Sequence, residues 1–375
     1  MDVLFVTSWY PSTVSVKNGN FIEQHALALK STGCNVVVVH VWYSNRTLVP
    51  GIKSVIQNEI PVHFISMPKV LKNSVKSHEK IFKKLISMLS NDGFKPEIIH
   101  GHVVFPAGRL ALYLKNHYSV PLVYTEHWSG YKPENTHLFT EEVTTLTTEV
   151  LGNTDLILPV SHDLAKTMAG KGFTGNYTVV NNTVNTSVFY LTQRDRSEKF
   201  RFLHVSNFEP RSKNTEGIIR AFVNGKFENA TLTIAGDGDL DKLRAFAKSL
   251  DGDISQIVFI GRQEYAEVAD LMRKSDCFIL FSNFENLPCV IAESHCCGLP
   301  VLATKVGGIP EMIDASNGVL IPAGDEEKLI AQMRELIAHR ISFNQSEIAE
   351  KASMRYSYET IGMELRKHYD SLLQK

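Results

Sequence analysis

The feature that most constrains this chain is a rhythm of short apolar runs, each of strand length, that alternate with helical stretches. In the first half the runs are residues 1–7, 36–41, 60–66, 97–100, 122–125 and 156–160. Strands that alternate with helices form parallel sheets with helices on both faces. The pattern therefore predicts an α/β fold with a doubly wound sheet.

The same rhythm restarts after a polar stretch from Asn182 to Lys199, with runs at 202–205, 232–235, 257–260, 277–281 and 300–303. A length of 375 residues also favours two domains over one. We expect an N-terminal domain over 1–190, a C-terminal domain over 191–355 and a closing helix over 356–375. Ligands should bind in strand-to-helix loops that face a central cleft between the domains.

Amino-acid composition indicates which kinds of partner and which cellular compartment suit this protein. The net charge of -1 and the pI near 6.9 exclude a strongly basic nucleic-acid-binding protein. Five cysteines, an odd number, fit packing roles in a reducing compartment. The N-terminus lacks the basic region of a signal peptide, and no window reaches the roughly 20 apolar residues of a membrane span. A soluble, cytoplasmic protein is expected.

The most informative segment runs from Phe281 to Glu293, where an apolar strand ends and a polar loop leads into a helix. Asn286 is placed as the N-cap, with Pro288 in the first turn. N–H groups from Leu287 onward would then meet a phosphate at the positive end of the helix dipole. The segment predicts an anion site.

Two carboxylates lie in this segment, Glu285 on the loop and Glu293 on the helix. A carboxylate accepts hydroxyl hydrogen bonds well, so the pair suits two separate hydroxyl clusters. Alternatively, both are solvated surface charges.

The neighbouring motifs decide between these alternatives. Glu285 and Glu293 reproduce an E-x7-E motif, and Gly307 to Glu311 reads G-G-I-P-E. Together they resemble the family 4 retaining glycosyltransferases of the GT-B fold. Further matches are Trp9-Tyr10-Pro11, Gly19-Asn20-Phe21, Ala235 to Gly238, Ile260-Gly261-Arg262 and Gly298 to Val301.

This resemblance implies two Rossmann-like domains that face a central cleft, with the C-terminal helix returning to the N-terminal domain. It implies transfer of a sugar from a nucleotide diphosphate donor, commonly a UDP-sugar, with retention of configuration. Attack on the same face of the sugar is assisted by the departing phosphate. No metal ion and no cofactor are expected, because a helix N-terminus and a lysine can hold the diphosphate.

The resemblance also implies individual roles. Glu293 would hold the ribose hydroxyls, and Glu285 the hydroxyls of the donor sugar. His127, which follows a strand in Tyr124 to Trp128, would contact that sugar. Gly19 would let the backbone approach the diphosphate. The remaining donor-binding candidates are Gly261, Arg262, Asn286, Leu287 and Pro288.

The cations for the diphosphate lie in the loop from Ser206 to Asn214. Lys213 matches the family's phosphate-binding lysine. The family usually has an arginine several residues earlier, where this chain has Asn207. Whether Arg211 replaces it stays open.

Metal-like patterns are weak. His100 and His102 lie two residues apart on a strand end, without a third ligand nearby in sequence, which favours packing or acceptor contact. No Asp-x-Asp motif occupies a strand end.

The acceptor, a glycan or a lipid-linked sugar, is expected on the N-terminal domain. Residues 69–89 combine six lysines with apolar residues at helical spacing. Such a helix could rest on the inner face of a membrane as a peripheral contact. It could equally dock on its own sheet and leave its basic face in water.

Two other classes of function remain open. One is another GT-B sugar-phosphate enzyme: a sugar-nucleotide epimerase would not require both motifs, and a phosphorylase would need a cofactor lysine, for which the sequence shows no recognisable setting. The other is a donor-binding pseudoenzyme or interaction protein, motivated by Asn207.

Overall fold

The computed structural model describes residues 1–12, 18–72, 74–193, 195 and 197–374, and the chain forms two compact units. Unit 1 comprises Met1–Thr183 and Tyr358–Lys375, and unit 2 comprises Val184–Ser357. The sequence placed the first boundary at 190/191, later than the structure has it. The reason is that Val184 and Phe189 are buried, and the ring of Phe189 packs edge-on against Tyr265 of unit 2.

In the described part of unit 1 the strands form one seven-stranded sheet in the order β3-β4-β2-β1-β5-β6-β7. Their bounds are β1 Asp2–Thr7, β2 Asn35–Ser44, β3 Gly51–Gln57, β4 Ile60–Pro68, β5 Ile98–His102, β6 Leu122–Glu126 and β7 Leu156–Pro159. All neighbours are parallel except β3 and β4. Without β3, the order is that of a Rossmann sheet, which reverses direction beside β1.

Strand β3 was not predicted from the sequence. It forms an antiparallel hairpin with β4 through a tight turn at Asn58 and Glu59, both with positive φ. Such turns usually carry glycine, which glutamate here replaces. Strand β3 also has few buried residues, so its hydrophobic alternation is faint.

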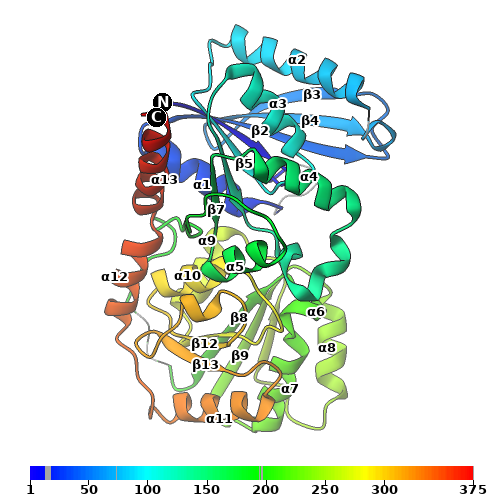
Figure 1. Cartoon of the computed structure of the whole chain (residues 1–375). Helices are drawn as coiled ribbons and strands as arrows, with labels where there is room; N and C mark the ends of the chain where they lie inside the picture. The colour runs from blue at the N-terminus through cyan, green and yellow to red at the C-terminus, as the bar shows by residue number, and fades with distance from the viewer. Residues whose placement is uncertain (13–17, 73, 194, 196, 375) are drawn as a thin grey trace. The chain divides into compact units, whose positions relative to one another are not determined.

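The helices of unit 1 are α1 Asn20–Ser31, α2 Val75–Asn91, α3 Gly108–Tyr118, α4 Glu141–Gly152, α5 His162–Gly170 and α13 Tyr358–Leu373, with short 3-10 turns η1 Lys69–Leu71, η2 Ser129–Tyr131 and η3 Pro133–Leu138. Figure 1 shows α13, in red, beside α1, in blue. Ile361, Leu365 and Tyr369 of α13 are buried in the core of this unit. The C-terminal helix thus returns to the N-terminal unit, as the resemblance implied.

In the described part of unit 2 a six-stranded parallel sheet has the order β10-β9-β8-β11-β12-β13. The bounds are β8 Phe200–Ser206, β9 Ala230–Gly236, β10 Ile257–Ile260, β11 Cys277–Leu280, β12 Val301–Thr304 and β13 Gly318–Ile321. Only β13 was missed by the sequence, because it is a four-residue edge strand with two half-buried positions. The order again reverses beside the first strand, here β8.

The helices of unit 2 are α6 Pro210–Lys213, α7 Thr215–Gly225, α8 Leu240–Ser249, α9 Tyr265–Arg273, α10 Cys289–Cys296, α11 Glu326–Ile337 and α12 Gln345–Tyr356, with η4 Ile309–Glu311. Its core is a cluster of buried side chains from the sheet and from α7, α8 and α11. The predicted fold class is confirmed: both units are doubly wound α/β domains.

None of the helices in the described ranges is both long and apolar enough to cross a membrane.

Candidate functional site

The sheet of unit 2 reverses its strand order between β8 and β11, and the loops that follow these two strands carry the charged motifs. In open α/β sheets, ligands bind outside the carboxyl ends of the strands at such a switch point. The loop after β8 leads through α6 to Lys213, and the loop after β11 carries Glu285. The topology therefore brings together two candidates that are 72 residues apart in sequence.

Lys213 and Glu285 form an ion pair in which Nζ donates to Oε1 over 2.5 Å. Ser282 donates its hydroxyl to the same oxygen over 2.8 Å. Only 8% of Glu285 is exposed. Among the described residues no hydrogen bond reaches Oε2 of Glu285, so this oxygen keeps its capacity to accept hydrogen bonds from a ligand.

Backbone contacts hold the two loops together. The amide N–H of Asn283 donates to the carbonyl of Ser212 over 2.7 Å, and its side-chain amide donates to the carbonyl of Arg211 over 3.0 Å. Glu209 caps α6 by accepting from the N–H groups of Arg211 and Ser212. Asn207, at the position of the family arginine, is exposed and accepts from the N–H of Glu209. Arg211 is also exposed.

The G-G-I-P-E loop packs directly against the Glu285 loop. Gly307 has φ of 54°, and a Cβ on it would overlap the carbonyl oxygen of Glu285. The N–H of Gly308 donates to the carbonyl of Asn286 over 2.8 Å. The two most specific motifs are therefore one physical assembly, in which glycine at 307 sets the position of Glu285.

Helix α10 begins later than predicted. Its first residue is Cys289 and its N-cap is Pro288, so the prediction of Asn286 as N-cap is wrong. The physical reason is that the Asn286 carbonyl is engaged by the G-G-I-P-E loop, while Pro288 keeps an extended ψ of 116°. Leu287 and Pro288 are buried at this entry to the helix.

Glu293 lies on α10 and is half-buried, and burial raises the pKa of its carboxyl to about 7. The hydroxyl of Tyr265 donates to its Oε1 over 3.2 Å. Tyr265 is the first residue of α9, three residues after Arg262 in the loop that follows β10. A Cβ added to Gly261 would make an ordinary contact with the side chain of Leu240, at 3.7 Å.

Sequence reasoning missed two polar partners of the carboxylates, Ser282 and Tyr265. Ser282 stands three residues before Glu285 and was visible in the motif. Tyr265 carries no motif signal, because only the packing of α9 against α10 brings it to Glu293.

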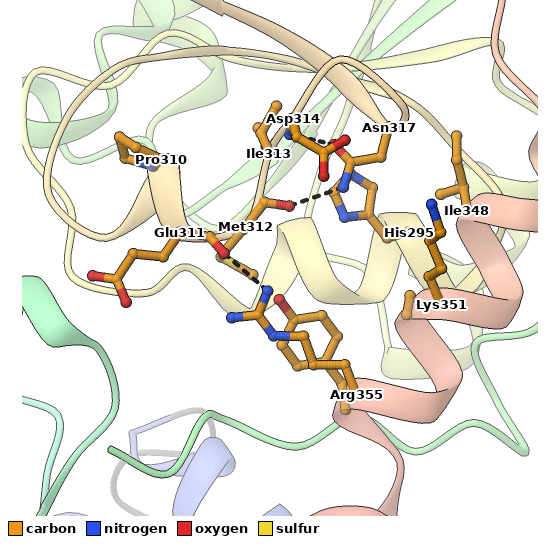
Figure 2. Close-up of a pocket in the computed structure, with 12 residues that line it drawn as sticks. His295, Pro310, Glu311, Met312, Ile313, Asp314, Asn317, Ile348, Lys351 and Arg355 are labelled. Carbon is orange, nitrogen blue, oxygen red and sulfur yellow. Dashed lines mark hydrogen bonds between the residues drawn. The ribbon is translucent and has the colours of Figure 1, made fainter. Parts of the chain in front are cut away.

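Figure 2 shows a pocket of about 210 Å³ on another side of the G-G-I-P-E loop. Pro310 and Glu311 line it together with His295 of α10 and residues of α12. Arg355 of α12 donates to the carbonyl of Glu311 over 2.9 Å, as the figure marks. Neither Glu285 nor Glu293 lines this pocket. The contact ties α12 to the loop.

In unit 1, Gly19 is the N-cap of α1 with φ of 79°. A Cβ there would lie 2.5 Å from the carbonyl carbon of Trp9. The packing of the Gly19 motif against the Trp9 motif therefore requires glycine at position 19. This requirement holds whether or not Gly19 contacts a ligand. The contact of Gly19 with a diphosphate stays a prediction.

His127 follows β6 and is only 9% exposed. Its Nε2 lies 3.3 Å from Nδ1 of His102, and its Nδ1 lies 3.2 Å from Oδ1 of Asn182. The ring also packs against that of Phe21 of α1, with ring centroids 4.5 Å apart and planes tilted by 39°. Burial lowers the pKa of His127 well below its usual value, with the charge of His25 adding to the effect, so the ring is neutral.

His100 does not join a metal-like site. Its Nδ1 lies 2.5 Å from the hydroxyl of Tyr369 on α13, and its Nε2 lies 2.7 Å from that of Thr125. Over the ranges that the structure describes, no three His, Cys, Asp or Glu side chains are arranged to hold a metal ion. His100 instead ties the C-terminal helix to the sheet.

Comparisons with known proteins agree with this architecture. Residues 19–188 match the model of Glycosyltransferase Family 4, and residues 192–354 match that of Glycosyl transferases group 1. An uncharacterized glycosyltransferase of Methanocaldococcus jannaschii is 30% identical over 284 residues, which cover 74% of this chain and 76% of the relative. A putative teichuronic acid biosynthesis glycosyltransferase of Bacillus subtilis is 23% identical over 86% of this chain and 85% of its own length.

Two solved structures share the whole fold. Anabaena HepE in complex with UDP has a TM-score of 0.78 and 19% identity, covering 99% of this chain and 100% of that one. Sucrose-phosphate synthase from Thermosynechococcus elongatus has a TM-score of 0.78 and 16% identity, and the match covers 100% of this chain and 99% of that one. The fold and the paired motifs define a GT-B glycosyltransferase. The chain belongs to family 4 of these enzymes.

Proposed function

We propose that this glycosyltransferase moves a sugar from a nucleotide diphosphate, with uridine as the favoured base, to a glycan or lipid-linked acceptor of cell-surface polysaccharide or glycolipid synthesis. Transfer retains the anomeric configuration and uses no metal ion. The observation that carries the proposal is the Lys213–Glu285 pair at the switch point of unit 2. It places a cation for the leaving group beside an acceptor for sugar hydroxyls.

In this proposal the diphosphate lies at Lys213 and the start of α10, with Arg211 as a second cation. A lysine and the N-terminal end of a helix stabilise developing phosphate charge without a divalent ion. Departing phosphate takes the acceptor proton as the acceptor attacks from the same face.

The other contacts follow from the same two loops. Oε2 of Glu285 accepts from donor-sugar hydroxyls, and the Glu293–Tyr265 pair holds the ribose. The turn at Gly261 and Arg262 adjoins the base. From unit 1, Gly19 approaches the diphosphate and His127 contacts the donor sugar.

What related proteins bind supports a nucleotide-sugar donor. HepE is described in complexes with UDP and with UDP-glucose, which favours uridine. A relative from Corynebacterium glutamicum, 30% identical over 142 residues, is named as GDP-mannose-dependent, so guanosine is the first competitor to test. The Bacillus relative is named for teichuronic acid biosynthesis, which supports a polysaccharide acceptor.

A peripheral contact with the inner face of a membrane, through residues 69–89, is part of the proposal; residue 73 lies outside the described residues. The apolar side chains Phe82, Leu85 and Leu89 of α2 are buried in unit 1. Lysines 76, 80, 83 and 84 are exposed, and Val75 beside them is 69% exposed. Val70, in the same stretch, is 90% exposed. Anionic lipid would therefore meet lysines and two separate valines rather than an apolar stripe.

The test is a thermal-shift screen against UDP, GDP, ADP and their common sugar conjugates, with and without EDTA, followed by product analysis. We expect one nucleotide to raise Tm equally with and without EDTA, and slow hydrolysis of its sugar conjugate to give the retained anomer first. A shift that EDTA abolishes would overturn metal independence. Binding without any hydrolysis or transfer would favour the pseudoenzyme that Asn207 suggests.

A further inference from the structure

Unit 1 contains a pocket of about 560 Å³ that no step of the proposed function uses. Its floor is a sheet face made by the side chains of Trp42 on β2, Phe64 and Ser66 on β4, and Lys53 and Val55 on β3. Glu23, in the first turn of α1, forms a wall. The volume is within the roughly 300–1,000 Å³ of small-molecule sites.

The pocket lies near the residues that the proposed function places in unit 1. Glu23 is four residues after Gly19, and its N–H donates to the Gly19 carbonyl. Phe21, two residues before Glu23, packs against the ring of His127. Trp42 and Ser66 pair near the carboxyl ends of β2 and β4. The pocket therefore shares the loop edge of the sheet with Gly19 and His127.

The polar groups around the pocket have hydrogen-bonding capacity that no residue described in the structure uses. Glu23 accepts from Gln57 and Asn58 at 2.8 Å, and both bonds go to Oε1, which fixes the carboxylate and leaves Oε2 for a ligand. Among the described residues, neither the ammonium of Lys53 nor the indole N–H of Trp42 makes a hydrogen bond or ion pair. The site thus offers a carboxylate as acceptor, an ammonium and an indole N–H as donors, and the hydroxyl of Ser66 beside them.

The apolar part is an aromatic surface made by two rings whose planes are tilted by 44° to each other. Trp42 is half-buried and packs against Phe64 with ring centroids 6.2 Å apart, and Val55 adjoins them. A ligand with one apolar face and a rim of hydroxyls would match this combination of ring surface, carboxylate and donors.

Other small-molecule classes fit less well. An alkyl chain would bury Lys53, Glu23 and the indole N–H without partners, which is costly. A diphosphate would meet the carboxylate of Glu23 and only one cation. A pyranose covers the aromatic surface with its C–H face and satisfies the carboxylate, the ammonium and the N–H with its hydroxyls.

We propose that this pocket is a subsite for a pyranose unit of the acceptor, with Trp42 as its stacking platform and Glu23 and Lys53 as its hydroxyl contacts. The inference rests on the proposed function for its meaning, since it names the chemistry of the acceptor. It does not depend on that function for its test, because binding of a free sugar can be measured without a donor.

The experiment is saturation-transfer NMR of the full chain with methyl β-glucopyranoside, methyl N-acetyl-β-glucosaminide and methyl β-glucuronide, and with 1-decanol as the apolar probe. At least one glycoside is expected to bind. Trp42→Ala and Glu23→Gln should each weaken this binding at least about fivefold, the scale of one lost contact. Trp42→Phe should restore part of it. Ile56→Ala, on the opposite face of β3, is the matched control and should change nothing.

The outcomes separate the pocket from the proposed function. Preferential binding of 1-decanol, no glycoside binding, or glycoside binding that survives both Trp42→Ala and Glu23→Gln would each overturn the pyranose subsite. UDP-induced thermal shifts should be unchanged in these variants. Glycoside binding without any nucleotide-induced shift would support the subsite while rejecting the donor chemistry of unit 2.

Discussion

From the residues that the structure describes, Glu285 receives two side-chain hydrogen bonds, both on a single oxygen, and this asymmetry decides what substitutions near it do. Lys213 has two effects at once: it neutralises a largely buried carboxylate and, in the proposed reaction, the leaving diphosphate. The effect of Lys213 on protein stability can therefore be separated from its effect on sugar transfer, by substituting Lys213 alone or together with Glu285.

Lys213→Ala should lower the free energy of unfolding by about 1–3 kcal/mol, because Glu285 is left buried without its counter-charge. The double variant Lys213→Ala/Glu285→Ala should recover most of that loss in urea unfolding. Transfer should fall at least about 100-fold in each single variant and stay low in the double one. Lys248→Ala, an exposed lysine of unit 2, is the control. Sugar transfer at the wild-type rate by both single variants would contradict the assignment of Lys213 and Glu285 to the active site.

The raised pKa of Glu293 predicts that the free energy of unfolding depends on pH. Its pKa is raised by burial from 4.5 to about 7, so between these values the folded protein binds more protons than the unfolded chain. Stability should therefore fall as pH rises from about 4.5 to about 7, and stay lower above.

Glu293→Gln should remove this dependence and should be more stable than wild type at pH 8, by on the order of 1–3 kcal/mol. At pH 4 the two proteins should differ little. Unfolding by urea at both pH values measures the difference. The same variant should bind nucleotide more weakly, if the ribose lies at Glu293. A Gln variant that is less stable at pH 8 would show that the carboxylate is ionised and well paired.

At the scale of elements, the G-G-I-P-E loop and the Glu285 loop behave as one assembly, because a Cβ on Gly307 would overlap the backbone carbonyl of Glu285. Gly307→Ala should therefore cost more than the strain of positive φ alone. Gly324 provides the comparison: it has φ of 75°, yet no atom lies within 4 Å of where its Cβ would be.

Gly324→Ala should cost roughly 1 kcal/mol, the strain of a left-handed residue. Gly307→Ala should cost at least about 1–2 kcal/mol more and should reduce nucleotide-induced thermal shifts, because Glu285 must move. Urea unfolding and the thermal-shift assay measure the two effects. Equal costs at the two positions would mean that the loops are not coupled.

Much of the element pattern could be predicted from the sequence, because buried parallel strands are continuous apolar runs. The antiparallel β3 was missed because its turn uses glutamate at a position of positive φ and its strand is half exposed. The start of α10 was misplaced because Asn286 is a good N-cap residue, whereas here its carbonyl holds a neighbouring loop.

For the candidate site, the motifs indicated Glu285, Glu293 and Lys213, but they could not show that Lys213 pairs with Glu285. That contact follows from the strand order beside β8. Tyr265 was out of reach of the sequence because long-range helix packing, not a motif, brings it to Glu293. The roles of all these residues with a donor stay predictions.

At the scale of the whole molecule, unit 1 is completed by a helix from the far end of the chain. Ile361, Leu365 and Tyr369 of α13 fill its core, and Tyr369 meets His100. A fragment of residues 1–183 should therefore expose a large apolar surface and unfold readily. Unit 2, which has its own core, should fold alone as residues 184–357.

Circular dichroism and heat capacity, measured during thermal unfolding of the separate fragments, would check whether each unit folds alone. Residues 184–357 should melt in one cooperative transition. Residues 1–183 should do so only when residues 358–375 are co-expressed or joined to them. A fragment of 1–183 that melts as sharply alone as with α13 would contradict the role assigned to that helix.

The two ends of unit 2 meet: the N–H of Val184 donates to the carbonyl of Tyr356 over 2.8 Å, and Val184 forms a parallel bridge with Ser357. In connectivity, unit 2 is thus an insertion into unit 1, entered and left at one point. Insertions with adjoining ends are the kind that chains tolerate best. Exchange of this segment between relatives would alter the unit to which we assign the donor and leave the unit to which we assign the acceptor intact. New sugar specificities could arise by such modular exchange.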